Sequence, residues 1–218
     1  MGKNKSRSVL GDYSGKVGTV VLYNYRGTPV MKPLPAPSQE PASGKQLEQR
    51  AIFSLVKTLL TSLKKVIHTG FQVPRKSRKA PFDMAMSYHM KNCILHLAEG
   101  PSFQLEKLKL SNPVKRLQSV WKPVASVAEN NTLILNWELN PYPQKDVQLS
   151  DKVYIVVYDA TINRFSTFSC RRSDLGFSYS FIKEFAGHEL YSYLFLTSAD
   201  AKLVSETEYL GKVNLTLS

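Results

Sequence analysis

The stretch TLILNWELNP, residues 132–141, places Leu133, Leu135 and Trp137 at every second position. A period of two is typical of a β-strand that buries one face, because successive side chains of a strand point to opposite sides. The pair Asn130-Asn131 precedes the stretch and Asn140-Pro141 ends it, and both pairs favour turns. The stretch therefore predicts a strand with one face in a core and a turn at each end.

Similar short segments fill the chain after Pro101, with turn residues such as those at 160–163 between them. Strands at this spacing predict an antiparallel β-sandwich of seven or eight strands. The candidate segments are FQLEKLKL, SVWKPVASV, TLILNWEL, KVYIVVYD, RFSTFSC, FSYSFI, LYSYLFLTS and EYLGKVNLTL.

Helical patterns precede these strands. Ser43 and Gln46 have the spacing of a capping box, and Gly70 stands where a C-terminal cap is expected. Between them, apolar residues recur at helical spacing and predict an amphipathic helix of about 24 residues. A second helix is expected from Phe82 to about Leu97, and two antiparallel helices would bury their apolar faces against each other or against a hairpin. The apolar positions of the first helix are Ile52, Val56, Leu59, Leu63 and Val66.

The N-terminal region reads as a β-hairpin. TVVLYNY from Thr19 predicts a strand, RGTP a turn and VMKPL a second strand. The segment from Pro33 to Pro41 has too many prolines for a helix or a central strand and is expected to be an extended connector.

Two resemblances follow from these segments. TLILNWELNP looks like the second strand of fibronectin type III-like domains, and KVYIVVYD and LYSYLFLTSADAKLVSETEYL are similar to later strands of the same sandwich. The whole chain also resembles an uncharacterised family of Bacteroidota proteins of about 200 residues. That resemblance implies an architecture and a source but no activity. It is carried by Ser14–Gly18, Arg26 with Leu34-Pro35, Gln46–Phe53, Ser87–Asn92 and Val204–Gly211.

The expected fold class is therefore α+β: an N-terminal β-hairpin plus an antiparallel helical hairpin, followed by an Ig-like/fibronectin III-like antiparallel β-sandwich. Two domains are expected. Residues 1–100 would form a basic N-terminal module with an arm, the hairpin, the proline-rich connector and two helices. Residues 101–218 would form the Ig-like sandwich.

The sequence offers little support for enzyme chemistry. The glycine-rich stretch GDYSGKVGTVV lacks the Walker A spacing, has Val17 where that motif needs a hydroxyl, and leads into a strand instead of a helix. His89, Cys93 and His96 would share one face of the second helix, but a fourth zinc ligand is missing nearby, and burial in the helix contact is favoured. No order of Ser, His and Asp indicates a nucleophile. No enzyme activity, cofactor, metal or small-molecule substrate is expected.

The basic charge lies in one half of the chain. Residues 1–120 hold 20 lysines and arginines against 6 acids, whereas residues 121–218 hold 9 against 11. Such asymmetry favours a surface that faces a polyanion, although solubility alone would also explain it. Basic residues alternate with tyrosines in the hairpin, and others fall within about 40° of one line on the first helix. The candidate nucleic-acid or polyanion-binding residues are Lys16, Tyr23, Tyr25, Arg26, Lys32, Arg50, Lys57, Lys64, Arg75, Lys76, Arg78 and Lys79.

Two functional hypotheses remain open. In the first, a non-enzymatic binding or assembly protein uses its basic N-terminal half to contact a polyanion such as nucleic acid, or an acidic protein partner. In the second, a structural subunit, like a phage virion component or a cell-assembly adaptor, docks through its hairpin and Ig-like domain without nucleic acid. Homo- or hetero-oligomers fit both hypotheses.

A cytoplasmic or virion location is expected. Cys93 and Cys170 form no disulfide framework, no apolar h-region of a signal peptide is visible, and no apolar run is long enough to span a membrane.

Overall fold

The structure is a computed structural model, and it describes residues 14–25, 28–36, 40–74, 77 and 79–215. The chain divides into two compact units, Met1–Gly44 and Lys45–Ser218. The division falls at Gly44, whereas the sequence places a domain boundary near residue 100. The reason is that the helices share a hydrophobic core with the strands that follow them.

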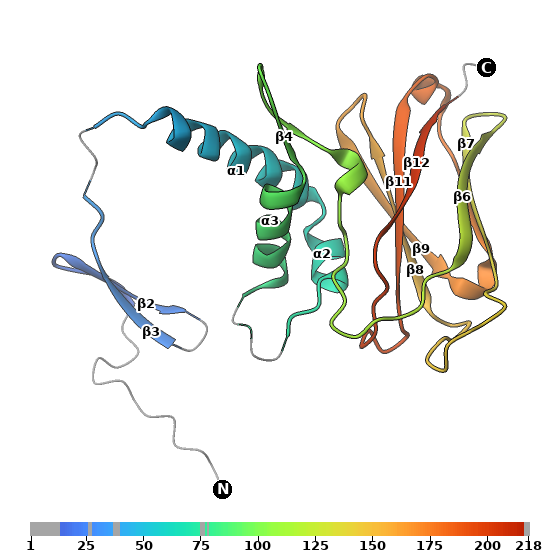
Figure 1. Cartoon of the computed structure of the whole chain (residues 1–218), viewed down its shortest axis with the longest axis horizontal. Helices are drawn as coiled ribbons and strands as arrows, with labels where there is room; N and C mark the ends of the chain where they lie inside the picture. The colour runs from blue at the N-terminus through green and yellow to red at the C-terminus, as the bar shows by residue number, and fades with distance from the viewer. Residues whose placement is uncertain (1–13, 26–27, 37–39, 75–76, 78, 216–218) are drawn as a thin grey trace, which may run out of the picture. The chain divides into compact units, whose positions relative to one another are not determined.

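The first unit holds a three-stranded antiparallel sheet in the order β1-β2-β3 (Figure 1). Its strands are β1 (Gly15–Val17), β2 (Val20–Tyr25) and β3 (Thr28–Pro33). β2 and β3 are the two expected strands, and β1 adds a third. Gly18 lies in the turn between β1 and β2 with a φ of 57°, a left-handed conformation that glycine adopts without strain.

In the second unit, the described residues form three helices: α1 (Gly44–Ser62), α2 (Lys64–Gly70) and α3 (Pro81–Asn92). The single long helix expected from the sequence is therefore two helices, because Leu63 departs from helical geometry with φ −96° and ψ 8°. The second expected helix ends at Asn92 instead of Leu97. Residues 94–97 instead form strand β4 (Ile94–Leu97), which pairs with β5 (Gly100–Phe103).

Gly70 ends α2 as expected, but the need for glycine at this position does not come from a left-handed helix cap. Its φ is not in the left-handed region, and a Cβ atom here would clash with the Leu110 carbonyl oxygen. The Asn112 amide also donates to the Gly70 oxygen at 3.0 Å. A glycine is needed because another backbone segment runs directly against the helix.

Seven strands form two further antiparallel sheets, one with the order β10-β7-β6 and one with the order β12-β11-β8-β9. The first expected segment, FQLEKLKL, is wrong as a strand, because Leu105–Lys107 form a 3₁₀ turn. Asn130 and Asn131, both with positive φ, make the expected turn between β6 and β7. The strands are β6 (Trp121–Ala128), β7 (Thr132–Glu138), β8 (Lys152–Asp159), β9 (Arg164–Arg171), β10 (Gly176–Ser180), β11 (Glu189–Thr197) and β12 (Glu208–Asn214).

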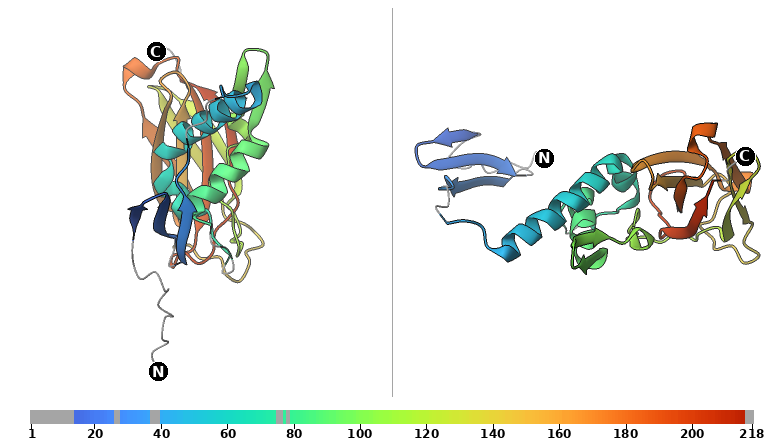
Figure 2. Two further views of the ribbon diagram at one scale, coloured as in Figure 1. Left: turned by 90° about the vertical axis from the view of Figure 1, so that its left-hand side faces the viewer. Right: turned by 90° about the horizontal axis from the view of Figure 1, so that it is seen from above.

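The four-stranded sheet β12-β11-β8-β9 lies between the β10-β7-β6 sheet and the helices, so the second unit has three layers (Figures 1 and 2). Leu133, Leu135 and Trp137 of β7 pack into the core between the two sheets, as their period of two predicts. On β11, Leu194 belongs to that core, whereas its neighbour Phe195 belongs to the core beneath the helices. Both faces of β8 and β11 are therefore buried.

Because both faces of β11 are buried, adjacent residues of this strand should contribute about equally to the stability of the fold. We expect Leu194→Ala and Phe195→Ala each to lower the free energy of unfolding by about 2–5 kcal/mol, because each leaves a cavity in a different core. Urea denaturation of the two variants measures this.

Val124→Ala is the control, because Val124 lies on the outer sheet with 58% of its surface exposed. We expect it to change the unfolding free energy by no more than about 0.5 kcal/mol. A similarly small loss for Phe195→Ala would contradict burial of that face under the helices.

Candidate polyanion-binding surfaces

The register of the β1–β3 sheet brings four of the candidate residues to one face. Lys16 of β1 and Lys32 of β3 both lie opposite Val21 of the central strand. Directly opposed residues of antiparallel strands share a face, and so do residues two apart on one strand. Tyr23 and Tyr25 therefore lie on the same face as the two lysines, which we call the Lys/Tyr face.

The side chains of the Lys/Tyr face are accessible. All four residues are exposed, and none of the described residues of β1–β3 is buried or acidic. The Lys32 ammonium lies 5.4 Å from the centre of the Tyr23 ring, within cation–π range. The face thus offers two cations and two aromatic rings to a ligand, with one ring already oriented by a lysine.

The opposite face of this sheet is apolar. Val17 and Met31 are each 58% exposed there, and Val20 and Leu22 are half-buried. A sheet of three short strands gains little stability without a covered apolar face. This face is therefore available to a partner on the side opposite the lysines and tyrosines.

The helical unit carries the second group of candidates. Arg50 and Lys57 on α1 and Lys64 at the start of α2 are exposed, and Lys79 is exposed just before α3. None of the salt bridges between described residues involves these four cations. Their charge is not neutralised by these ion pairs and can act on a ligand. Arg26, Arg75, Lys76 and Arg78 lie outside the described residues.

His89, Cys93 and His96 do not converge on a metal site. His96 lies on β4 instead of a helix, and its Nδ1 is 2.8 Å from Oε1 of Glu48. Cys93 is buried, its thiol donates to the Lys107 oxygen, and burial raises its pKa to about 11. Within the described ranges, no group of three or more His, Cys, Asp or Glu residues has the geometry for a metal ion.

His89 is instead a buried structural residue. Its Nδ1 donates to the Ala85 oxygen at 2.7 Å, and its Nε2 accepts from the Lys109 amide at 3.0 Å. Phe103 stacks on the ring with 5.8 Å between centroids. Burial lowers the pKa of His89 to about 4, so the ring is neutral near pH 7 and fixes the segment around Lys109 to α3.

Asp159, the last residue of β8, forms a hydrogen-bonded pair with His188. Nδ1 of His188 lies 2.7 Å from Oδ2 of Asp159, and Oδ1 of the same carboxylate accepts the amides of Thr161 and Ile162. In the part of the chain that the structure describes, no serine hydroxyl or cysteine thiol is hydrogen-bonded to the His188 ring. The pair lacks the nucleophile of a catalytic triad and instead supports a turn.

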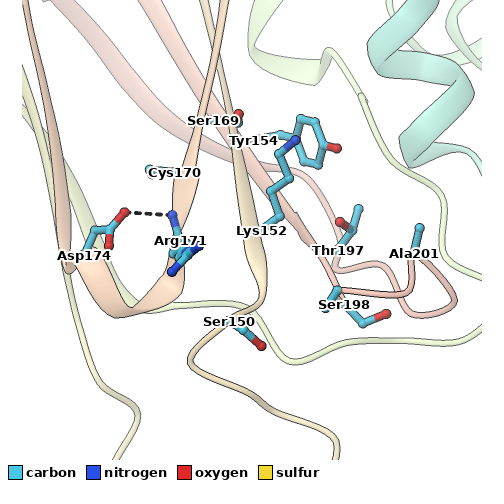
Figure 3. Close-up of a pocket in the computed structure, with 11 residues that line it drawn as sticks. Ser150, Lys152, Tyr154, Ser169, Cys170, Arg171, Asp174, Thr197, Ser198 and Ala201 are labelled. Atoms are coloured by element: carbon cyan, nitrogen blue, oxygen red, sulfur yellow. Dashed lines mark hydrogen bonds between the residues drawn. The ribbon is translucent and has the colours of Figure 1, made fainter.

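A polar depression of about 730 Å³ lies at the end of the four-stranded sheet (Figure 3). Burial raises the pKa of its Cys170 to about 11, so the thiol is not ionised near pH 7. Asp174 accepts from the Arg171 amide at 2.8 Å and serves the local turn. The depression has hydroxyls and two cations, and none of the hydrogen bonds among the described residues joins its Cys170 thiol to a carboxylate or a histidine. Its other side chains include Ser150, Lys152, Tyr154, Ser169, Thr197, Ser198 and Ala201.

The geometry above defines a class of protein: a helix-covered antiparallel β-sandwich with a small basic sheet on a separate unit. The chain belongs to the family described as "Family of unknown function (DUF6266)", whose model matches residues 12–211. Membership of a family without a known activity, expected from the sequence motifs, is thereby confirmed. A search of curated proteins found no match.

Among solved structures, 28 chains match. One is the twitchin kinase region from C. elegans (Fn31-NL-kin-CRD-Ig26), with 12% identity, a TM-score of 0.37, and coverage of 47% of this chain and 17% of that chain. Another is a cytokine receptor complex, with 9% identity, a TM-score of 0.32, and coverage of 46% of this chain and 52% of that chain. These partial likenesses carry no argument about function. In the described residues, no helix is long and apolar enough to cross a membrane.

The buried position of His89 predicts a pH-dependent stability. Its pKa is near 6.5 when unfolded and about 4 when folded, so the unfolded chain binds the extra proton between these values. Stability is therefore fully present above pH 6.5 and falls as the pH drops toward 4, by at most about 3 kcal/mol. Urea denaturation across this pH range measures the loss.

His89→Gln should be less stable at pH 7 but lack this part of the acid-dependent loss. His68→Gln is the matched control, because His68 is exposed on α2. A His89→Gln variant with the same slope between pH 6.5 and 4 as the original protein would show that another group is responsible.

Proposed function

We propose that this protein is a non-enzymatic binding or assembly protein whose basic N-terminal half contacts a polyanion, with single-stranded nucleic acid as the polyanion that its residues fit best. The observation that carries this proposal is the shared Lys/Tyr face of the β1–β3 sheet. Lysines neutralise phosphates without reading sequence, and tyrosine rings stack on unpaired bases.

The helical unit supports the same proposal through Arg50, Lys57, Lys64 and Lys79, which are exposed and lack salt bridges to described residues. The sheet and these helices belong to separate units, so we treat them as two independent contact surfaces. An acidic protein is the alternative ligand for the same cations. Binding of an acidic protein would not require the tyrosine rings, so the effect of replacing a tyrosine distinguishes the two ligands.

A second candidate function is a structural subunit of a virion or a cell-assembly complex. The observation that favours it is the apolar face with Val17 and Met31, which a partner's sheet could cover.

In both cases we place the protein in the cytoplasm or in a virion and its source in the Bacteroidota. We also propose that β6–β12 form a fibronectin type III-like domain, because the three-plus-four strand order matches that sandwich.

Salt-dependent binding tests the first proposal. Fluorescence anisotropy would follow labelled single-stranded DNA, single-stranded RNA and duplex DNA of one sequence at several salt concentrations. We expect single strands to bind more tightly than the duplex. Lys16→Gln with Lys32→Gln should reduce the slope of log K against log salt by about 1.4, or about 0.7 for each phosphate that the variant no longer neutralises. Tyr23→Leu should cost about 1–3 kcal/mol with single strands only.

Lys145→Gln with Lys183→Gln is the matched control, because it removes two exposed lysines from the sandwich half. Its slope should stay that of the original protein. Lys57→Gln with Lys64→Gln measures the contribution of the helices separately. Absence of binding at low salt would refute the nucleic-acid proposal, and tighter binding to polyglutamate than to either single strand would indicate an acidic protein instead.

A further inference from the structure

The helices leave an apolar groove of about 650 Å³ between α1 and α3. On α1 it is lined by Gln49, Phe53 and Lys57, which are four residues apart. On α3 it is lined at the same spacing by Phe82, Met86 and Met90. Residues at i, i+4 and i+8 share one helix face and extend over about 12 Å. Two rows of side chains therefore run along the groove for more than two helical turns.

The floor of the groove is apolar and adaptable. Phe53 is 47% exposed, although it is a large aromatic residue on a helix whose other large apolar groups are mostly covered. Phe82 and Met90 are half-buried, and they pack on the core beneath the helices. Methionine side chains are flexible and are frequent in grooves that receive apolar side chains of a partner.

The rim of the groove is basic. Lys57 and Lys91 are exposed, one on each helix, and no salt bridge between described residues involves either. The one acidic residue of the lining, Asp83, accepts from the Ala80 amide at 3.2 Å and caps the start of α3. A partner that complements this rim must bring its own carboxylates.

The chemistry of the rim also decides between occupants. The β1–β3 sheet, in this copy or in another, has Lys16 and Lys32 but no acid among its described residues. Docked through its apolar face, the sheet would turn Lys16 and Lys32 away from the groove and bring no carboxylate to Lys57 and Lys91, so the charges of the rim would stay uncompensated. A nucleic acid would satisfy the rim charges, but its phosphates would not fill an apolar floor.

We infer that the groove between α1 and α3 is a docking site for one amphipathic helix of a different protein, with apolar anchors at i, i+4 and i+7 and acidic residues beside them. A helix laid in a groove buries such anchors on one face and leaves its flanks at the rim. The site is separate from the Lys/Tyr face and does not require nucleic-acid binding, although Lys57 belongs both to its rim and to the polyanion contacts proposed for the helices.

Methionine-methyl NMR of the full chain tests this inference. The probe is a synthetic helical peptide of about 15 residues with leucines at i, i+4 and i+7 and glutamates beside them. We expect it to shift the methyl signals of Met86 and Met90 and to leave that of Met31 unchanged. The same peptide with lysines for glutamates should bind at least about tenfold more weakly, as should a scrambled peptide of identical composition.

Two sets of variants locate the site. Phe53→Glu should weaken binding of the glutamate peptide at least about tenfold, because it places a charge on the groove floor. Leu47→Glu is the matched control, since Leu47 is exposed on the same helix but does not line the groove. Its affinity should stay within about twofold. Lys57→Glu with Lys91→Glu should reverse the preference toward the lysine peptide, and this surface change does not rely on the floor.

Three results would overturn the inference. The first is that the glutamate peptide leaves Met86 and Met90 unshifted or binds no better than its scrambled form. The second is that these signals shift with protein concentration alone and Phe53→Glu abolishes the shift, which would identify a second copy as the occupant. The third is that single-stranded DNA moves them as the peptide does, which would assign the groove to the polyanion.

Discussion

The rest of the structure depends on the burial of one sheet on both of its faces. Leu194 and Ile155 point into the sandwich, whereas Phe195 and Val156, their neighbours in the chain, point toward the helices. Because successive side chains of a strand alternate in direction, a strand covered on both sides must be apolar at nearly every position. β8 and β11 meet this requirement, so the helices and the sandwich form one compact unit that divides from the rest of the chain at Gly44.

Polar backbone groups at the junction of the layers are hydrogen-bonded by a few side chains that are buried or half-buried. Tyr193 is fully buried, burial raises its pKa, and its hydroxyl donates to the Leu105 oxygen at 2.8 Å. The Thr207 hydroxyl accepts the amides of Leu110 and Ser111 at 2.9 and 2.8 Å. These bonds hold the irregular segment after β5 against the sheet, since an unpaired buried amide or carbonyl would cost about 1–3 kcal/mol. His89 acts in the same way from α3. His89 and Cys93, which have the spacing of metal ligands in the sequence, are thus buried in the packing of the layers.

The candidate surfaces lie where the cores do not reach. The β1–β3 sheet has no buried residue among those described, so its two faces differ only by pattern: lysine and tyrosine on one, Val17 and Met31 on the other. The groove between α1 and α3 is lined by the exposed Phe53, whereas Val56 and Leu60 of the same helix are buried. The anionic and apolar partners that we propose would therefore contact exposed side chains at the edges of these elements, with only the floor of the groove continuous with the core.

The sequence by itself determined the strand of Leu133, Leu135 and Trp137, the turns at Asn130-Asn131 and at 160–163, and the two strands around Tyr23, because local periodicity and turn chemistry act over a few residues. It also determined that the cations lie in the first half. Tertiary structure alone decided that Leu63 interrupts the first helix and that His96 lies on a strand. It also decided that position 70 must be glycine, because the backbone at Leu110 packs directly against it. These depend on contacts with distant segments, as does the α1–α3 groove. One local signal for two-sided burial was present, the nearly continuous apolar runs KVYIVVYD and LYSYLFLT, but only the packed layers specify what covers each face.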